Sequence, residues 1–185
     1  MSNDAARLLE EYLVAGARLG DRKAVARLAA LRGPKLYAHA MRLLGNRADA
    51  EDAVQDAWLE ILRGLNSLRD DRAFPAWAYR IVTRRAAKLI GQRVRQRDLA
   101  ATLSADADEV VEKHPDGLDA AAVRKAMQML PPPQAATIAL FYLEEMSVAE
   151  VALALDVPPG TVKTRLMHAR TKLHDALQGG ENEQA

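Results

Sequence analysis

Lysine, histidine, threonine and methionine side chains recur on one face of a potential helix near the end of the sequence. The apolar residues fall three and four positions apart and define the other face: Val162, Leu166, Ala169 and Leu173. The polar face consists of Lys163, Thr164, Met167, His168 and Thr171. No acidic residue occurs between Asp156 and Asp175. A short helix with a cationic, hydrogen-bonding face suits the major groove of DNA, so this pattern predicts DNA binding.

The residues before this helix predict the element that holds it in place. Ser147 and Glu150 have the spacing of a capping box, so a helix is expected to begin there. Its apolar stripe is Val148, Val151, Ala152 and Leu155. The segment 156–160 contains two prolines, which interrupt the helix because proline lacks the amide hydrogen. Residues 146–177 therefore predict a helix–turn–helix, although an ordinary amphipathic hairpin with a solvated basic face would show the same pattern.

A second cationic stretch follows Phe74 and is predicted to form a long helix to about Arg95. Its apolar side consists of Ala78, Ile81, Val82 and Leu89. Arg80, Arg84 and Lys88 recur every four residues on the other side, with Thr83 beside them. The stretch from Phe74 to Arg97 contains no acidic residue, and like charges at this spacing repel one another. A polyanion relieves that repulsion, so a DNA contact is predicted, with a solvated face as the alternative and Arg85 expected to snorkel.

The first 65 residues predict helices that would support this stretch. Residues 4–19 are expected to bury Leu8, Leu9, Tyr12 and Leu13, and residues 21–44 to form a second helix, broken or kinked at Gly33–Pro34. A third helix follows Gly45–Asn46, with acidic residues in its first turns, where they favour a helix N-terminus. Its expected buried stripe is Ala53, Val54, Ala57, Trp58, Ile61 and Leu62.

An acidic segment, residues 98–119, separates two helical domains in this interpretation. It contains too few apolar residues to form a core and is expected to be a flexible linker. The predicted fold is therefore all-α, with domains at 1–97 and 120–178 and a disordered tail at 179–185. Two helices, 120–130 and 133–143, separated by Pro131–Pro132, should support the helix–turn–helix through Leu140, Phe141 and Leu143.

Composition limits the function classes. The chain has 185 residues, 49% hydrophobic but only 4% aromatic, and a formal net charge of +1. It contains no cysteine, which excludes disulfides and thiolate metal sites. No signal peptide or run long enough to span a bilayer is present, so a soluble cytoplasmic protein is expected. The sequence shows no metalloprotease motif or phosphate-binding glycine loop, and neither an enzyme nor a bound cofactor or metal is expected.

Several motifs in one order carry a family resemblance. LYAHAMRLLGN, ADAEDAVQDAWLEIL and FPAWAYRIVTRRA, at residues 36–86, resemble region 2 of bacterial sigma factors. The stretch LPPPQAATIALFYLEEMSVAEVALALDVPPGTVKTRLMHARTKL, residues 130–173, resembles region 4. The chain as a whole is similar to RNA polymerase sigma factors of the extracytoplasmic-function (ECF) type, over residues 24–177.

The resemblance implies roles for three groups of residues. The core polymerase contact, on the beta-prime clamp helices, would use Asp49, Glu51, Asp52, Gln55, Asp56 and Trp58. The minus-10 element would be captured and melted by the 66–74 loop and the helix after it, with Phe74, Trp77, Arg80, Thr83, Arg84 and Lys88. The minus-35 element would be read by Lys163, Thr164, Met167 and His168, with Thr161, Arg165, Arg170 and Lys172 nearby. Arg165, Arg170 and Lys172 would hold phosphates.

Further partners also follow from the resemblance alone. Region 4 would contact the polymerase beta flap, the linker would thread toward the active-site cleft, and an anti-sigma factor would cover both domains. Arg84, Lys88 and His168 depart from the residues usual in the family, which affects base preference. Two alternatives stay open: a helix–turn–helix regulator that is not a polymerase subunit, and a purely helical interaction module.

Overall fold

The computed structural model describes residues 3–100 and 126–179, with side chains from 4 to 95 and from 126 to 176. Every regular element in these ranges is helical, as the sequence predicts. The chain divides into two compact units, Met1–Ala107 and Asp108–Ala185, and each is described by itself. Most of the acidic segment expected to be a linker, and the tail after residue 179, lie outside the described residues.

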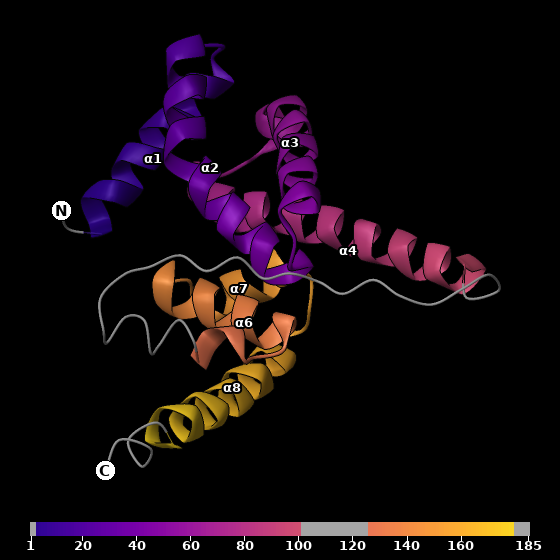
Figure 1. The fold of residues 1–185 in the computed structure, drawn as a ribbon. Helices are drawn as coiled ribbons and strands as arrows, with labels where there is room; N and C mark the ends of the chain where they lie inside the picture. The colour runs from indigo at the N-terminus through magenta and orange to yellow at the C-terminus, as the bar shows by residue number, and fades with distance from the viewer. Residues whose placement is uncertain (1–2, 101–125, 180–185) are drawn as a thin grey trace. The chain divides into compact units, whose positions relative to one another are not determined.

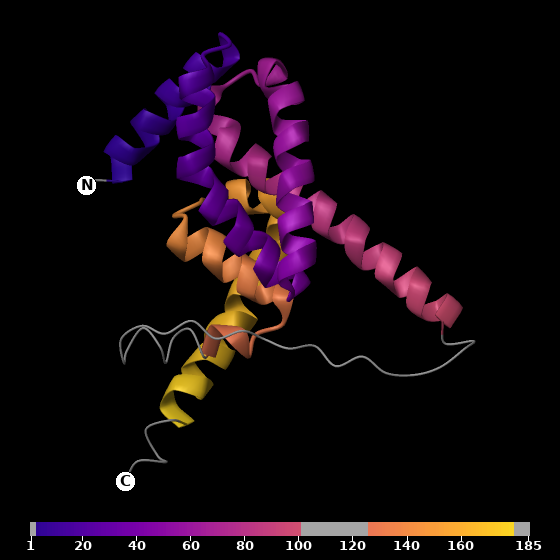
Figure 2. The same cartoon turned by 45° about the horizontal axis from the view of Figure 1, so that its top comes forward.

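The described part of the first unit contains four long helices, shown in Figures 1 and 2. They are α1 (Asn3–Arg18), α2 (Arg22–Leu44), α3 (Arg47–Gly64) and α4 (Phe74–Ala100), and two short 3₁₀ turns, η1 (Leu65–Ser67) and η2 (Asp71–Ala73), connect α3 to α4. The second half of α4 extends beyond the other three helices in both views. Asp21 and Asn46 cap α2 and α3: their side chains accept hydrogen bonds from the backbone amides of Lys23 and Asp49.

Two expectations about the first helices are wrong in part. Pro34 does not break α2, which continues through it because packing against α1, α3 and α4 compensates for one missing hydrogen bond. In α1 the exposed fractions of Leu8 and Tyr12 are 65% and 73%, so these side chains do not form the buried face. Leu9 is 42% exposed as well, whereas Leu13 is buried as predicted, together with Glu10, Val14 and Ala17. The buried face of α1 is rotated relative to the predicted face because Glu10 is buried in an ion pair with Arg32, which the hydrophobic pattern cannot show.

Small residues bring α3 close to its neighbours. Its buried stripe is Ala50, Ala53, Ala57 and Ile61. Leu62, which was predicted to belong to this stripe, is 46% exposed and lies outside it. Val54 and Trp58 are only half-buried. Alanine at the contact face lets α4 pack closely on α3, because helix separation depends on the side chains between the axes.

His39 lies at the centre of the first unit and connects α2 to α4. Its ring packs edge-on against Tyr79, with 5.1 Å between the ring centroids. The Thr83 hydroxyl donates to the Tyr79 carbonyl at 2.9 Å, so it accepts from His39 Nε2, also at 2.9 Å. Nδ1 is buried and has no hydrogen-bond partner among the described residues. His39 is therefore neutral, with its proton on Nε2.

The described part of the second unit contains helical residues 126–128, α6 (Pro132–Ile138), a π-helical turn η3 (Ala139–Leu143), α7 (Val148–Leu155) and α8 (Pro159–Gly179). The first residues of the predicted helix 120–130 lie outside the described residues. The predicted capping box is confirmed: Ser147 and Glu150 exchange hydrogen bonds of 2.7 and 3.2 Å. Asp156 ends α7 in the left-handed region, with φ of 55°. Leu140 is buried as predicted, but Leu143 is 57% exposed, because the π turn rotates the residues that follow Leu140.

None of the helices in the described ranges combines the length and the hydrophobicity needed to cross a lipid bilayer.

We expect the stability of the first unit to depend on the charge of His39. Burial, with a smaller effect of the Arg42 charge, lowers the pKa of His39 from 6.5 to about 3. The unfolded chain takes up a proton near pH 6.5 while the folded chain does not. The stability that neutral His39 contributes is thus fully present above pH 6.5 and is lost as the pH falls toward 3.

Between pH 8 and pH 5 the free energy of unfolding should fall by about 2 kcal/mol more in the natural chain than in His39→Gln. Glutamine can still donate to Thr83 but does not titrate. Both tryptophans, Trp58 and Trp77, lie in the first unit, so urea unfolding followed by tryptophan fluorescence reports this unit. Equal pH dependence in the two proteins would contradict the role given to His39.

Candidate nucleic-acid interface

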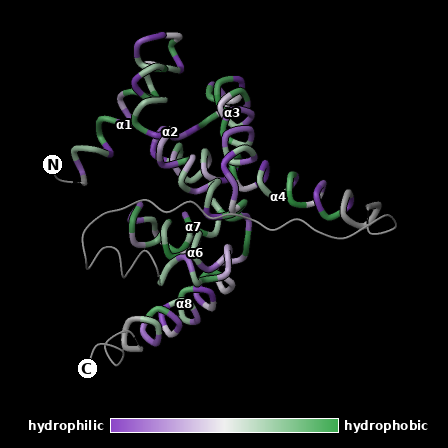
Figure 3. Tube along the Cα trace, viewed as in Figure 1, coloured by the Kyte–Doolittle hydropathy of each residue, from purple (hydrophilic) through white to green (hydrophobic). Residues whose placement is uncertain are grey.

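The cationic face of α8 is exposed, and its apolar face is buried. Val162 and Ala169 are fully buried and Leu166 is 4% exposed. This face belongs to the core of the second unit, where α8 packs on α6 and α7. Hydrophilic and hydrophobic residues alternate along α8 in Figure 3, as this division requires. The side chains of the polar face are exposed: Lys163, Thr164, Met167, His168, Arg170, Thr171 and Lys172. Thr161, Arg165 and Leu173 are half-buried.

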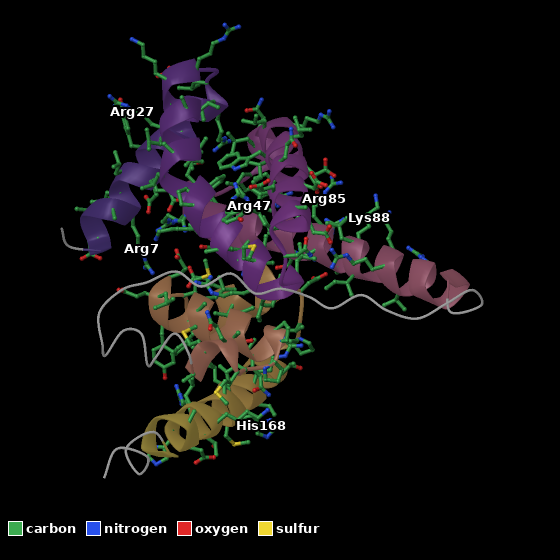
Figure 4. All side chains as sticks on the ribbon, viewed as in Figure 1. Arg7, Arg27, Arg47, Arg85, Lys88 and His168 are labelled. Carbon is green, nitrogen blue, oxygen red and sulfur yellow. The ribbon has the colours of Figure 1, made fainter. Side chains whose placement is uncertain are left out.

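Hydrogen bonds within α8 leave its polar face able to contact bases. The Thr164 hydroxyl donates to the Gly160 carbonyl at 3.1 Å, so toward solvent it presents a methyl group and acceptor lone pairs. Met167, 57% exposed, adds an apolar surface of the kind that can meet a thymine methyl group. His168 lies at the outer side of α8 in Figure 4.

Arg170 is held in place by a residue that the sequence pattern did not identify. Its Nε donates to the hydroxyl oxygen of Tyr142 at 2.7 Å, and its guanidinium lies 5.6 Å from the centre of the Tyr142 ring. Tyr142 belongs to η3, a turn whose π geometry places it 50% exposed. No spacing rule connects positions 28 residues apart, so sequence reasoning had no signal for this pair.

Acidic residues of α3 neutralise part of the cationic stretch of α4. Glu60 accepts from Arg85 Nε at 3.0 Å and from Nη2 at 2.5 Å, and Asp56 accepts from Arg85 Nη1 at 3.4 Å. Glu60 also lies 3.9 Å from Arg84. Arg85 was expected to snorkel, but it is an ion-pair partner of α3, as Figure 4 shows by its oxygen-bearing neighbours. The acid-free stretch in the sequence is therefore not acid-free in space.

Arg84 and Lys88 of the predicted minus-10 set are exposed on α4, as is Arg95 further along the helix. The Arg84 side chain is 62% exposed despite its distant contact with Glu60, and Lys88 is exposed one turn further along. Arg80 and Thr83 are half-buried. This exposed pair is the part of the predicted minus-10 surface that DNA could reach most readily.

Two aromatic residues of the predicted minus-10 set have packing roles. Phe74 is completely buried at the start of α4, so it is not part of an exposed interface, contrary to the expectation. Trp77 is half-buried and lies against Gly64, where an added Cβ would be 3.0 Å from the indole ring. The ring therefore fixes the end of α3 relative to the start of α4.

The predicted polymerase-binding residues lie along α3, and several form ion pairs. Asp49 is 2.6 Å from Arg93, Glu51 is 2.8 Å from Arg47, and Asp56 is paired with Arg85. Asp52 and Gln55 are exposed, and Trp58 is half-buried. A cavity of about 160 Å³ between α3 and α4 is lined by Asp52, Ala53, Asp56, Arg85, Lys88, Leu89 and Gln92.

Comparison with known proteins assigns both units. The sigma-70 region 2 family matches residues 28–96, and the sigma-70 region 4 family matches residues 120–173. The ECF RNA polymerase sigma factor SigM of Mycobacterium tuberculosis is 34% identical over 161 residues, which cover 87% of this chain and 81% of that protein. SigW of Bacillus subtilis is 29% identical over 177 residues, which cover 86% of this chain and 91% of that protein.

Solved structures show the same fold. The sigma factor RpoE of Bartonella quintana, in complex with the anti-sigma factor NepR, has a TM-score of 0.68 at 24% identity and covers 83% of this chain and 96% of its own. CnrH, in complex with the cytosolic domain of CnrY, has a TM-score of 0.63 at 25% identity, and the match covers 92% of this chain and 98% of CnrH. The chain belongs to the ECF sigma factors of the sigma-70 family, and it directs transcription initiation.

Proposed function

We propose that α8 reads the minus-35 element while α4 and the loop before it bind the minus-10 element of the same promoter. The observation that supports this most is the exposed face of α8, which presents Lys163, Thr164, Met167 and His168 in a stretch without acidic residues. A helix–turn–helix exposes such a face when it enters the major groove. An independent helix–turn–helix regulator would account for the second unit but would leave α3 and α4 without a role.

The residues of α8 divide by the kind of contact they can make. Lys163, Thr164, Met167 and His168 would lie nearest the base edges, where hydrogen bonds and methyl contacts distinguish sequences. Arg165, Arg170 and Lys172, with Thr161 at the start of the helix, would hold phosphates and set the position of the helix. Tyr142 supports this division, because it fixes the Arg170 guanidinium without using all its donors.

The minus-10 surface in this proposal consists of the loop 65–73 and the exposed part of α4. Trp77, Arg80, Thr83, Arg84 and Lys88 belong to it, and Phe74 supports it from below. Opening a duplex requires cations for the displaced strand and a surface for an unstacked base. Arg84 and Lys88 supply the charge, and Trp77 supplies a partly exposed ring.

Core RNA polymerase would bind the exposed side of α3, at the beta-prime clamp helices, and region 4 would contact the beta flap. Asp52 and Gln55 are exposed at the centre of the predicted set, with Asp49, Glu51, Asp56 and Trp58 around them. The ion pairs with Arg47, Arg85 and Arg93 keep three of these carboxylates in place before polymerase arrives.

An anti-sigma factor is the proposed inhibitor of this chain. Two proteins of the same fold were solved with partners: the sigma factor RpoE with the anti-sigma factor NepR, and CnrH with the cytosolic domain of CnrY. The exposed apolar side chains of each unit offer surface for such a partner, among them Tyr12 and Leu143.

Substitutions in α8 test the minus-35 assignment. Lys163→Ala and His168→Ala should each cost about 1–3 kcal/mol at the correct promoter and relax sequence discrimination, because each removes a base contact. Arg170→Ala should weaken binding to all sequences alike and lower the salt dependence by about one released ion. Binding of the holoenzyme to promoters with single minus-35 changes, at several salt concentrations, measures both effects. If Lys163→Ala and His168→Ala affect every promoter equally, the assignment of base contacts is wrong.

A charge reversal on α3 tests the polymerase contact. Asp52→Lys should weaken binding to core polymerase about tenfold or more, since the lysine would place a positive charge against a surface that is complementary to an acidic one. Asp4→Lys makes the same change on an exposed position of α1 and should have little effect. Anisotropy titrations of labelled protein with core enzyme give both affinities, and equal affinities for the two variants would rule out α3 as the docking surface.

A further inference from the structure

Helix α1 lies outside the residues that match the region 2 family, yet it packs directly on the loop proposed to bind the minus-10 element. The match covers residues 28–96, whereas α1 covers Asn3–Arg18. Besides α2, α1 packs on both η1 and η2. In Figure 2 the chain between α3 and α4 crosses toward the turn that joins α1 to α2. The loop therefore has a neighbour that region 2 proper does not supply.

An ion pair joins the last residue of α1 to the loop. Arg18 Nη1 donates to the Asp71 carboxylate at 2.7 Å, and the two side chains are 32% and 26% exposed. Asp71 is the first residue of η2, the turn that leads into α4. Glu11 of α1 adds an attractive charge interaction with Arg72, the next residue of the same turn. Two side chains of α1 thus act on one turn of the loop.

The loop has few long-range polar contacts of its own. Ser67 donates to the Gly64 carbonyl at 2.6 Å, and Asp70 accepts from the amide of Arg72 at 3.0 Å and from its Nε at 3.1 Å. The amides of Leu68 and Ala73 bond to carbonyls three residues earlier. All of these bonds are local, so they shape the turns but do not fix the loop relative to the helices. The Arg18–Asp71 pair spans 53 residues and does so.

A second, buried ion pair holds α1 in register with α2, the helix that carries Arg32. Glu10 and Arg32 are 4% and 7% exposed, and Arg32 Nε donates to Glu10 Oε1 at 2.7 Å. The Arg32 guanidinium also lies 5.8 Å from the ring centre of Tyr79, which is on α4. Removing one partner of a buried pair is costly, so α1 cannot easily shift along α2. The position of α1 along α2 therefore places Arg18 within reach of Asp71.

We propose that Arg18 is a positioning residue for promoter opening, because its ion pair with Asp71 orders the loop 65–73 before DNA binds. This inference rests on the proposed function of that loop in minus-10 recognition. A loop ordered in advance loses less conformational entropy when it captures an unstacked base, so it binds more tightly. The contact with polymerase, on α3, does not involve Arg18.

The test uses the full chain and four variants: Arg18→Ala, Arg18→Asp, Asp71→Arg and the double exchange Arg18→Asp/Asp71→Arg. Arg27→Ala is the matched control, since Arg27 is an exposed arginine on α2 (Figure 4). Hydrogen exchange of the free protein reports on the amides of Leu68 and Ala73. Permanganate reactivity of the minus-10 thymines, in holoenzyme with a promoter selected from genomic DNA by run-off transcription, reports on opening. Affinity for core enzyme is measured for every variant.

Arg18→Ala should accelerate exchange of the loop amides about fivefold, the effect of losing a well-ordered ion pair. The same variant should reduce promoter opening several-fold, while affinity for core enzyme stays at the natural value. Arg18→Asp should accelerate loop exchange and reduce promoter opening more than Arg18→Ala does. The double exchange should restore slow loop exchange and promoter opening in large part. Arg27→Ala should change none of them.

Two results would overturn the inference in different ways. Unchanged loop exchange in Arg18→Ala, or no recovery in the double exchange, would show that the ion pair does not order the loop, and would leave the proposed function of the loop intact. Accelerated exchange with normal opening would show that loop order does not matter for the promoter. That second result would also count against the minus-10 role proposed for the loop.

Discussion

Cross-helix charge pairing between α3 and α4 decides what the first unit can do. A helix with as many cations as α4 cannot pack on other helices unless their charges are either solvated or paired, because a buried unpaired charge is costly. Glu60 and Asp56 pair with Arg85, and Asp49 pairs with Arg93. Arg84 and Lys88 stay exposed. The pairing thus separates cations that hold the unit together from cations exposed to solvent, and it places the acids of the proposed polymerase-binding surface beside them.

Among its described residues, the second unit accommodates the cations of α8 without ion pairs of this kind. In α8 the apolar stripe Val162, Leu166 and Ala169 is fully packed, so the cations need no acidic partner and point to solvent. Arg170 is fixed by a polar contact within the unit, and its partner is the neutral Tyr142. A neutral partner orients the guanidinium but leaves its positive charge uncompensated. The charge therefore remains available for a phosphate.

Local features were predictable from the sequence, and contacts between distant residues were not. The capping box at Ser147 and the break at Pro131 depend on neighbours a few positions away, so residue type and spacing sufficed. The buried face of α1 was mispredicted in part, because Glu10 counts as polar until its partner Arg32 is known. Phe74 was assigned to DNA because the resemblance marks its position, but burial against the bundle needs the fold. The same reason hid the partners of Arg85 and Arg170.

The central claim is that the exposed cations of both units act together as parts of one polymerase holoenzyme. Footprinting of a promoter selected from genomic DNA, with the chain alone, core polymerase alone and both together, tests it most directly. The account predicts that only the mixture protects the minus-35 and minus-10 elements at once and makes minus-10 thymines reactive to permanganate. Full protection by the chain alone, unchanged when core polymerase is added, would contradict it.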